Sequence, residues 1–339
     1  MSTMWTNSRR KWCCLLFLSV VSLPTYSYFI LQAFSSLRRA PPSFTGNTTI
    51  LLWHWPFGKP CNLSGDVCLE HWGIHGCLLV DNRSLFSRAN LVVFHNHELM
   101  SGRQKLPLKR IRPSGQRWVW LSLESPENNG KSWVQRKHFD YIMTYRRDAD
   151  ITIPYGQLVS KEAENDGTVG AFIPKGKTSL ACWVVSNYSK HHKRTAVYEK
   201  LKKVIPVEVY GRAVNKYLDA HNLLPTISRC YFYLAFENSI STDYITEKFW
   251  YNALVGGAVP VVLGPPREQY EAVAPKDSFI HVDDFRSIEE LGNFLKKLAE
   301  DKERYAKYFA WKQQHTVKLY RDWRERLCAI CAKLRKPNT

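Results

Sequence analysis

Acidic residues are scarce in this chain of 339 residues, where 30 aspartates and glutamates face 48 lysines and arginines. The formal net charge of +18 indicates an anionic partner. Nucleic acid does not fit well, because the basic residues are spread along the chain and no nucleic-acid-binding module is legible. A phosphate-bearing ligand, an acidic glycan or an anionic membrane surface would each suit the charge.

Internal repeats and low-complexity segments are absent as well, which excludes a solenoid or a repetitive array. A chain of this length is enough for about two domains of ordinary size. Hydrophobic residues make up 45% of the sequence, enough for well-packed cores. The 12 Trp, 17 Tyr and 16 Phe suit a sugar-binding cleft, although ordinary cores use aromatic residues too.

The N-terminal apolar segment lacks a convincing small-residue cleavage site. Arg9–Lys11 precede a mostly apolar run over residues 12–34, and two arginines follow it. The run is long enough to span a bilayer, so we interpret it as a signal anchor rather than a removed signal peptide. The sequence therefore predicts a cytoplasmic tail over 1–11, a transmembrane segment over 12–34 and a stem over 35–48.

Charges on both flanks leave the orientation of the anchor open. Several glycosylation sequons on one side of it favour a lumenal body. They begin at Asn47, Asn62, Asn82 and Asn187. We predict a single-pass type II protein glycosylated at Asn47, Asn62 and Asn82. Asn187 lies close to the ligand site predicted below, where a glycan would be awkward.

Cysteine usage agrees with an oxidising compartment. Cys13 and Cys14 lie in the predicted span, and seven cysteines follow it, so at least one of the seven stays unpaired. The seven are Cys61, Cys68, Cys77, Cys182, Cys230, Cys328 and Cys331. Cys328 and Cys331 have the spacing of a redox or zinc motif. We reject both functions, because the pair ends a charged helical tail and has no second ligand pair.

The body is predicted to hold two α/β halves joined by a polar linker over residues 157–177. Buried strands are expected at residues 49–53, 91–94, 118–121 and 141–144 of the first half and at 179–185, 207–210, 231–236, 259–263 and 279–282 of the second. Helices are expected at residues 193–204, from 245, at 268–273 and from 288 to about 311. Alternating strands and helices predict parallel sheets covered by helices on both faces.

The most informative motif runs from Phe236 to Trp250 and is followed by a second buried strand. Its polar residues come after a strand, where open α/β sheets bind ligands. They are Asn238, Tyr244, Glu247 and Lys248. A helix that begins near Ile245 and carries a lysine offers a seat for phosphate. The ordinary alternative is an exposed Glu–Lys pair on a surface helix, which leaves the two bracketing strands unexplained.

This motif, Phe-Glu-Asn followed by Asp-Tyr-Ile-Thr-Glu-Lys-Phe-Trp and then Pro-Val-Val-Leu-Gly-Pro-Pro, resembles the donor-binding signature of the α1,3-fucosyltransferases. These enzymes move L-fucose from GDP-fucose to the N-acetylglucosamine of a glycan. Other stretches resemble family motifs in the same order, and the resemblance covers nearly everything after about residue 49. They are Trp53–Phe57, Val93–Leu99, Glu124–Pro126, Tyr145–Asp150, Pro154–Gly156, Val184–Asn187, Tyr210–Arg212, His281–Phe285 and Asp322–Arg326.

Trp53–Phe57 and Asp322–Arg326 point, within the family, to members that fucosylate sialylated N-acetyllactosamine. The resemblance implies an α/β fold of the glycosyltransferase B type, in which two Rossmann-like domains face a cleft. Residues 49–176 would form the N-terminal acceptor-binding domain and residues 177–339 the C-terminal GDP-fucose-binding domain. The signal-anchor helix would precede both and hold the protein in the Golgi membrane.

The resemblance also implies two disulfides, Cys68–Cys77 and Cys328–Cys331. A further pair that the family commonly has just after the Tyr-Gly-Arg motif is missing, since residues 212–229 contain no cysteine. Cys230 is therefore expected to be a buried thiol or to pair with Cys182 or Cys61.

Donor-contacting positions of the family match seven residues of this chain, one of them, Arg212, only loosely. They are Arg194, Arg212, Tyr233, Asn238, Tyr244, Glu247 and Lys248. Lys248 and Arg194 would neutralise the leaving diphosphate as fixed cations. Asp148 and Asp150 have the spacing of a metal-binding pair, but we interpret them as a turn. No cofactor and no essential metal are expected.

Glu124 is the expected general base. It follows a buried strand, and the family pattern assigns the base to this position, where a salt-bridged surface glutamate would be the ordinary alternative. Glu98 is the second choice and is expected, with His95, to contact acceptor hydroxyls. Its motif departs from the family's usual His-His-Arg, which leaves the acceptor preference open. Trp55 and Trp120 would stack on acceptor sugars or belong to the core.

Two functions from different classes follow. The first is an inverting α1,3-fucosyltransferase that uses GDP-fucose and acts on sialylated or neutral N-acetyllactosamine of glycoproteins or glycolipids. The second is a lumenal lectin-like or scaffold protein on an inactive transferase fold. Alteration of Glu124, Glu247 or Lys248 would favour the second, and all three residues are present.

Overall fold

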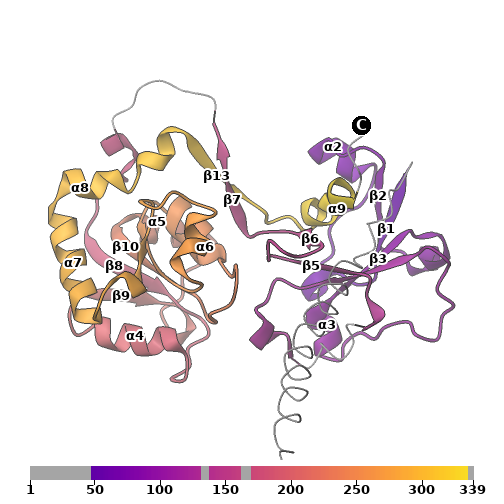
Figure 1. Cartoon of the computed structure of the whole chain (residues 1–339), viewed down its shortest axis with the longest axis horizontal. Coiled ribbons are helices and arrows are strands. Elements are labelled where there is room, and N and C mark those ends of the chain that lie inside the picture. Colours follow the sequence, from indigo (N-terminus) through magenta and orange to yellow (C-terminus); the bar gives the residue numbers. More distant parts are fainter. Residues whose placement is uncertain (1–46, 131–136, 162–168, 335–339) are drawn as a thin grey trace, which may run out of the picture. The chain divides into compact units, whose positions relative to one another are not determined.

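A computed structural model of the chain describes residues 47–130, 137–161 and 169–334 (Figure 1). The first of its sheets is six-stranded and parallel throughout, in the order β2-β1-β3-β4-β5-β6. The strands are β1 (Thr48–Leu52), β2 (Cys77–Val80), β3 (Leu91–His95), β4 (Arg117–Leu121), β5 (Tyr141–Thr144) and β6 (Ile151–Thr152). The central strand β3 is buried along its whole length, as parallel strands covered on both faces are.

Three helices of this region lie near β2 and β3: α2 (Val67–Trp72), α3 (Asn96–Met100) and α9 (Trp323–Leu334). The helix α9 comes from the far end of the chain, and Figure 1 shows it beside α2 and β2. It places Leu327 and Ile330 in the same core cluster as Ile50 and Val93. The core of the first sheet is therefore completed by the last described helix.

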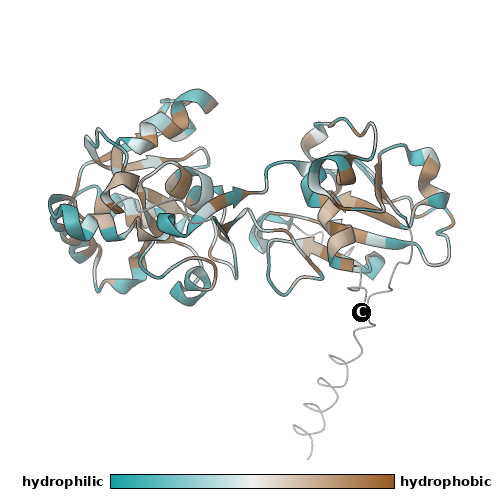
Figure 2. Cartoon of the chain, turned by 90° about the horizontal axis from the view of Figure 1, so that it is seen from above, coloured by the Kyte–Doolittle hydropathy of each residue, from teal (hydrophilic) through white to brown (hydrophobic). Residues whose placement is uncertain are grey.

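The second sheet is five-stranded and parallel, in the order β12-β11-β10-β8-β9. Its strands are β8 (Ser179–Val184), β9 (Val207–Tyr210), β10 (Cys230–Phe236), β11 (Val259–Leu263) and β12 (Ile280–His281). Its helices are α4 (Lys193–Leu201), α5 (Ala220–Ser228), a π-helix (Lys248–Val255), α6 (Arg267–Glu271), α7 (Ile288–Glu300) and α8 (Lys302–Lys307). Figure 2 shows hydrophobic residues gathered on the strands and hydrophilic ones on the surrounding helices.

The predicted parallel α/β architecture is confirmed, and the nine predicted strands form close to their expected places. The single helix expected from 288 to about 311 is wrong. Asp301 interrupts it with an extended backbone and caps α8 by accepting a hydrogen bond from the Arg304 N–H. The helix expected from Ile245 begins at Lys248 and has π-helical geometry.

The stretch predicted as a linker begins instead as the strand β7 (Gly156–Ser160), which pairs antiparallel with β13 (His315–Leu319). Gly156 is required here, because a Cβ at this position would lie 2.7 Å from the Trp250 ring. Within the described residues no helix is long and apolar enough to cross a membrane. The anchor predicted over 12–34 lies outside them.

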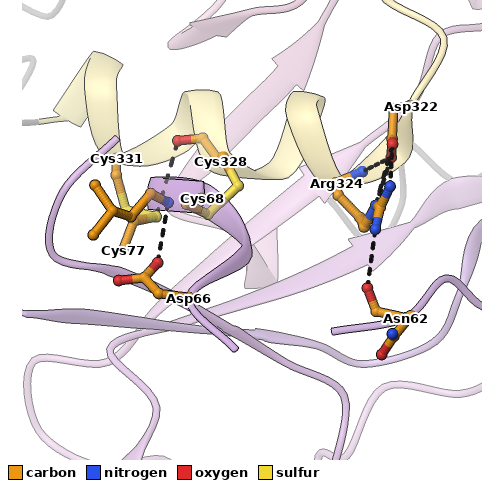
Figure 3. Close-up of a disulfide and its surroundings, with 9 residues drawn as sticks. Asn62, Asp66, Cys68, Cys77, Asp322, Arg324, Cys328 and Cys331 are labelled. Atoms are coloured by element: carbon orange, nitrogen blue, oxygen red, sulfur yellow. Dashed lines mark hydrogen bonds and ion pairs between the residues drawn. A yellow bond between two sulfur atoms is a disulfide. The ribbon is translucent and has the colours of Figure 1, made fainter. Parts of the chain in front are cut away.

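The two disulfides that the resemblance implied are wrong in their pairing. Cys68 bonds to Cys328 and Cys77 bonds to Cys331 (Figure 3). The physical reason is the position of α9, since residues three apart share one face of a helix and this face packs on α2 and β2. Of the pairings left open, Cys182 bonds to Cys230 on the neighbouring strand. Among the described residues Cys61 is the free cysteine.

Candidate active site

The order in which the chain adds strands to the second sheet reverses between β8 and β10. The chain first places β9 on one side of β8 and then crosses back to place β10 on the other side. Open α/β sheets bind ligands at such a switch point, outside the carboxyl ends of the strands. Two segments emerge here, residues 185–192, which lead into α4, and residues 237–247, which lead into the π-helix.

A cavity of about 270 Å³ is lined by both segments. Its wall includes residues 191–194 at the start of α4, residues 237–240 after β10, and Glu127 and Asn128 from the loop after β4. Cationic and amide side chains therefore meet at the start of a helix, a combination that suits a phosphate-bearing ligand.

Arg194 is buried at this cavity. Its guanidinium donates to the Asn187 carbonyl and, at 3.4 Å, to the Phe236 carbonyl. Burial lowers the pKa of Arg194, and the charge of Glu237 opposes that shift. Among the described residues, neither Nε of Arg194 nor Oδ1 of Asn238 has a partner. Arg194 Nε is therefore available to donate to an anionic ligand, and Asn238 Oδ1 is available to accept from a ligand hydroxyl or N–H.

Lys248 lies in a network of oxygens rather than on an exposed helix surface. Its Nζ is 3.0 Å from Glu237 Oε2, 3.1 Å from Glu247 Oε1 and 2.7 Å from Thr246 Oγ1. Burial disfavours the ammonium, but the two carboxylates outweigh it and raise the pKa of Lys248. The side chain of Glu237 is 0% exposed, whereas that of Glu247 is 52% exposed. Glu247 can therefore meet a ligand, while Glu237 fixes the lysine.

Tyr244 is buried against two other tyrosines, with ring centroids 5.0 Å from Tyr145 and 6.4 Å from Tyr155. Burial raises the pKa of Tyr244, and nearby carboxylates including Glu124 add to the shift. Its hydroxyl therefore stays protonated and able to donate a hydrogen bond.

Of the seven predicted donor residues, Arg194 and Asn238 line this cavity, and Lys248 is linked to it through its ion pair with the lining residue Glu237. Among the described residues, Tyr233 and Arg212 have no such link. Tyr233 is fully buried in β10, where its hydroxyl accepts a hydrogen bond from Asn252 Nδ2 at 2.9 Å. Arg212 is exposed in a short 3₁₀ helix after β9. The structure thus brings Arg194, Asn238, Glu247 and Lys248 to one region and leaves Tyr233 in the core.

Glu124 opens the loop that follows β4 and is half-buried. The next residue joins this loop to the one after β10, since Ser125 Oγ donates to Ser239 Oγ at 2.9 Å. Backbone contacts fix Glu124, whose N–H donates to Ser122 Oγ and whose carbonyl accepts from Asn129 Nδ2. Its carboxylate accepts no hydrogen bond from the described residues, which leaves it able to take a proton.

The carboxylate of Glu98 already accepts hydrogen bonds from neighbouring groups. Its Oε2 lies 2.6 Å from His95 Nδ1, and its Oε1 accepts from the Phe57 N–H at 2.7 Å. His54 Nε2 is 3.8 Å from the same carboxylate. Burial would raise the pKa of Glu98, but the hydrogen bond and charge of His95 outweigh it and lower the pKa. Glu98 is therefore less suited than Glu124 to accept a proton.

The two tryptophans expected to stack on acceptor sugars differ in exposure. Trp55 is buried in the core of the first sheet, and its Nε1 donates to Asp81 Oδ2 at 2.8 Å. Trp120 is half-buried in β4, and its Nε1 donates to Asn96 Oδ1 at 3.2 Å. Trp120 has the more accessible ring.

Asp148 and Asp150 point to separate partners. Asp148 accepts two hydrogen bonds from Arg146, and Asp150 accepts one from the Ile142 N–H. Over the part of the chain that the structure describes, no cluster of three or more histidine, cysteine, aspartate or glutamate residues could hold a metal ion.

The predicted glycosylation sites are surface residues. Asn47, Asn62 and Asn82 are exposed, and so is Asn187. The side-chain oxygens of Asn62 and Asn82 accept hydrogen bonds from the N–H groups of Ser64 and Ser84. Whether any of these sequons carries a glycan stays a prediction.

Sequence reasoning missed Glu237 and His54. Glu237 stands directly after the largely buried strand β10 and before the predicted ligand residue Asn238, which was the available signal. His54 sits within a recognised motif, and its contact with His95 arises because β1 and β3 are neighbours in the sheet.

Comparisons with known proteins cover both regions. The profile "Glycosyltransferase family 10 (fucosyltransferase) C-term" matches residues 174–339, and "Fucosyltransferase, N-terminal" matches residues 45–156. Alpha-(1,3)-fucosyltransferase 7 of Bos taurus is 49% identical over 294 residues, covering 86% of this chain and 83% of that protein. The Homo sapiens protein of the same name is 47% identical over 304 residues, covering 89% and 86%.

A related protein is more distant: 4-galactosyl-N-acetylglucosaminide 3-alpha-L-fucosyltransferase 9 of Rattus norvegicus is 42% identical over 293 residues, covering 86% of this chain and 79% of that one. A crystal structure of an α1,3-fucosyltransferase with GDP-fucose has a TM-score of 0.52 and 18% identity, covering 88% of this chain and 93% of the other, a likeness of fold alone. On the profile matches and the extended identity to its relatives, this chain belongs to glycosyltransferase family 10, the fucosyltransferases.

Proposed function

We propose that this protein is an inverting α1,3-fucosyltransferase. It transfers L-fucose from GDP-β-L-fucose to the 3-hydroxyl of N-acetylglucosamine in N-acetyllactosamine glycans, including sialylated ones. The products would be of the sialyl Lewis x type, which selectins recognise. The observation that carries the proposal is the identity of 47% and 49%, over most of both chains, to proteins named alpha-(1,3)-fucosyltransferase 7.

The cavity at the switch point supports binding of the donor. The diphosphate of GDP-fucose would lie at the start of α4, where Arg194 Nε has no partner among the described residues, and Asn238 Oδ1 would accept from a hydroxyl or N–H of the donor. Lys248 supplies a second fixed cation, and Glu247 is exposed enough to accept hydrogen bonds from ribose or fucose hydroxyls. Preorganised cations of this kind stabilise a leaving group without a bridging metal.

The assignment of Glu124 as the general base is supported by its carboxylate, which accepts no hydrogen bond from the described residues. The acceptor O3 attacks the anomeric carbon of the β-linked fucose while the bond to the phosphate oxygen breaks. GDP leaves with that electron pair, and the O3 proton passes to Glu124. One in-line displacement converts a β-linked donor into an α-linked product.

The protein would act in the Golgi lumen. The predicted anchor over residues 12–34 and the exposed sequons support a single-pass type II arrangement with a lumenal body. Glycoproteins or glycolipids that carry N-acetyllactosamine would be its partners.

The test is incubation of the full-length protein with GDP-fucose and, side by side, sialylated and neutral N-acetyllactosamine. We expect GDP release together with an α1,3-fucosylated product identified by NMR. Tight glycan binding without GDP release would instead favour the lectin-like or scaffold alternative.

A further inference from the structure

A second cavity, of about 360 Å³, lies at the carboxyl ends of β1 and β2. Its wall is formed by residues 53–55 after β1, by Asp81 and Arg83 after β2, and by Arg103 and Gln104 after α3. Aromatic rings and charged groups therefore share one concave surface, as in sites that bind polar ligands.

The loop between α3 and β4 is rich in positive charge, and one of its cations, Arg103, lines the cavity. Residues 101–123 contain no carboxylate, and their cations are Arg103, Lys105, Lys109, Arg110, Arg112 and Arg117. Asp140 pairs with Arg112 and Arg117. Within the described ranges the other four cations have no ion-pair partner, and neither does Arg83.

Arg83 is held in place by neutral groups. Its Nε donates to the Trp53 carbonyl at 2.8 Å, and NH2 donates to Gln104 Oε1 at 2.9 Å. The guanidinium lies 4.6 Å from the centroid of the Trp53 ring, and that of Arg110 lies 5.7 Å from the same ring. Burial lowers the pKa of Arg83, and the charge of Arg110 adds to the shift. Two cations thus lie near one indole, and neither forms an ion pair with a described residue.

Two carboxylates also line the cavity, Asp81 and Glu98, and both accept hydrogen bonds from neighbouring groups. Asp81 accepts from Trp55 Nε1, and Glu98 is held by His95 and the Phe57 N–H. Two buried nitrogens on lining residues, Trp53 Nε1 and His54 Nδ1, have no partner among the described residues. The cavity therefore combines unpaired cations, hydrogen-bonding groups and aromatic rings, which together match an acidic carbohydrate.

The position of the cavity relates it to the proposed base. In the sheet order β1 is separated from β4 by β3 alone. Neighbouring strands lie about 4.8 Å apart, so the end of β1 is roughly 10 Å from the end of β4. Glu124 follows the last residue of β4, Leu121, by three positions. A trisaccharide can reach from one point to the other.

We infer that this cavity is a subsite for a negatively charged group, carboxylate or sulfate, carried by the acceptor glycan, and that Arg103 and Arg83 recognise it. The inference rests on the proposed function, because the remainder of the same acceptor would present its hydroxyl to Glu124. Arg103 is exposed and adaptable, whereas Arg83 is preorganised by Trp53 and Gln104.

The test uses the full-length protein with three acceptors: neutral, 3′-sialylated and 3′-sulfated N-acetyllactosamine. Arg103→Gln should lower kcat/KM for the two acidic acceptors roughly 10- to 100-fold, as expected for loss of a hydrogen bond between charged groups. The neutral acceptor and the KM for GDP-fucose should not change. Arg103→Lys should recover part of the discrimination, and Arg88→Gln, an exposed cation that does not line the cavity, should behave as wild type.

The other possible results of this test lead to different conclusions about the cavity. A sulfated acceptor that responds while the sialylated one does not would assign the subsite to sulfate. Equal losses on acidic and neutral acceptors, or no loss on any, would overturn the inference while leaving the proposed function intact. Reduced binding of Arg103→Gln to anionic lipid vesicles, without a change in acceptor discrimination, would assign the cations to a membrane surface and overturn it too. Absence of transfer to all three acceptors, with no hydrolysis of GDP-fucose, would contradict the proposed function itself.

Discussion

Glu124 carries the sharpest prediction at the scale of single residues. Glu124→Gln should reduce turnover about 10²- to 10⁴-fold, because the amide keeps the size of the side chain but cannot take the acceptor proton. GDP affinity, measured by calorimetry, should be close to that of the wild type. Loss of GDP binding in this variant would move Glu124 into the donor site, and near-normal turnover would make Glu98 the better base despite its contacts with His95 and Phe57.

The two donor-site cations should respond differently to truncation. Arg194→Ala should lower kcat/KM roughly 10²- to 10³-fold, the range for removing one stabilising donor from a transition state. Lys200→Ala, an exposed lysine on the same helix α4, is the matched control. Equal activity of both variants would exclude Arg194 from the donor site.

Lys248→Ala should impair folding as well as catalysis, because it leaves the fully buried side chain of Glu237 without its cation. Breaking a buried pair from one side costs about 3–5 kcal/mol. The double variant Lys248→Ala/Glu237→Gln removes the stranded charge and should regain much of the free energy of unfolding, measured with urea, without regaining activity. If the double variant is also active, Lys248 serves the fold alone.

His54 gives the protein a dependence on pH. Burial lowers the pKa of His54 from its ordinary value of 6.5. Below pH 6.5 the unfolded chain therefore binds a proton that the folded protein resists, so stability is present above that pH and is lost as the pH falls further. The melting temperature should drop between pH 7.5 and 5.5, and His54→Asn should weaken the drop in this window. Glu98, whose pKa is also lowered, contributes only in the more acid window below 4.5.

At the scale of elements, the loop after β10 is fixed by an ion pair. Asp243 has a left-handed backbone with φ of 59°, and its carboxylate accepts from Arg147 Nε at 2.9 Å and from the Arg147 N–H at 3.0 Å. Asp243→Asn tolerates this backbone but loses the charge, and Asp243→Gly tolerates it without a side chain. Both should raise the KM for GDP-fucose several-fold, because Tyr244 and Glu247 follow in the same loop. A wild-type KM in the glycine variant would mean that the backbone conformation alone matters.

Elements with a strong local signal were predictable. Short apolar strands such as β3 and β10 and the order of helices between them follow from composition. The strands β7 and β13 were missed because they are only partly buried and pair across a long stretch of chain. Glu237 was missed for a similar reason: the sequence places it after a strand but does not say that Lys248 folds back onto it.

At the scale of the whole molecule, the mechanism rests on charges that belong to the protein. Treatment with EDTA should therefore leave most of the activity in place, as measured by GDP release under saturating GDP-fucose. Complete loss of activity that manganese restores would contradict the metal-independent mechanism and favour Asp148 and Asp150 as metal ligands.

The return of α9 to the first sheet has a consequence for biogenesis. The bonds Cys68–Cys328 and Cys77–Cys331 join residues 260 and 254 positions apart. During vectorial synthesis the first sheet leaves the ribosome long before α9, so Cys68 and Cys77 are made long before their partners. Oxidation between them would leave Cys328 and Cys331 without their native partners until that bond was exchanged. The native bonds can therefore form only after α9 has been made, so a catalyst of thiol–disulfide exchange should speed folding, and a chain that ends before Cys328 lacks both bonds.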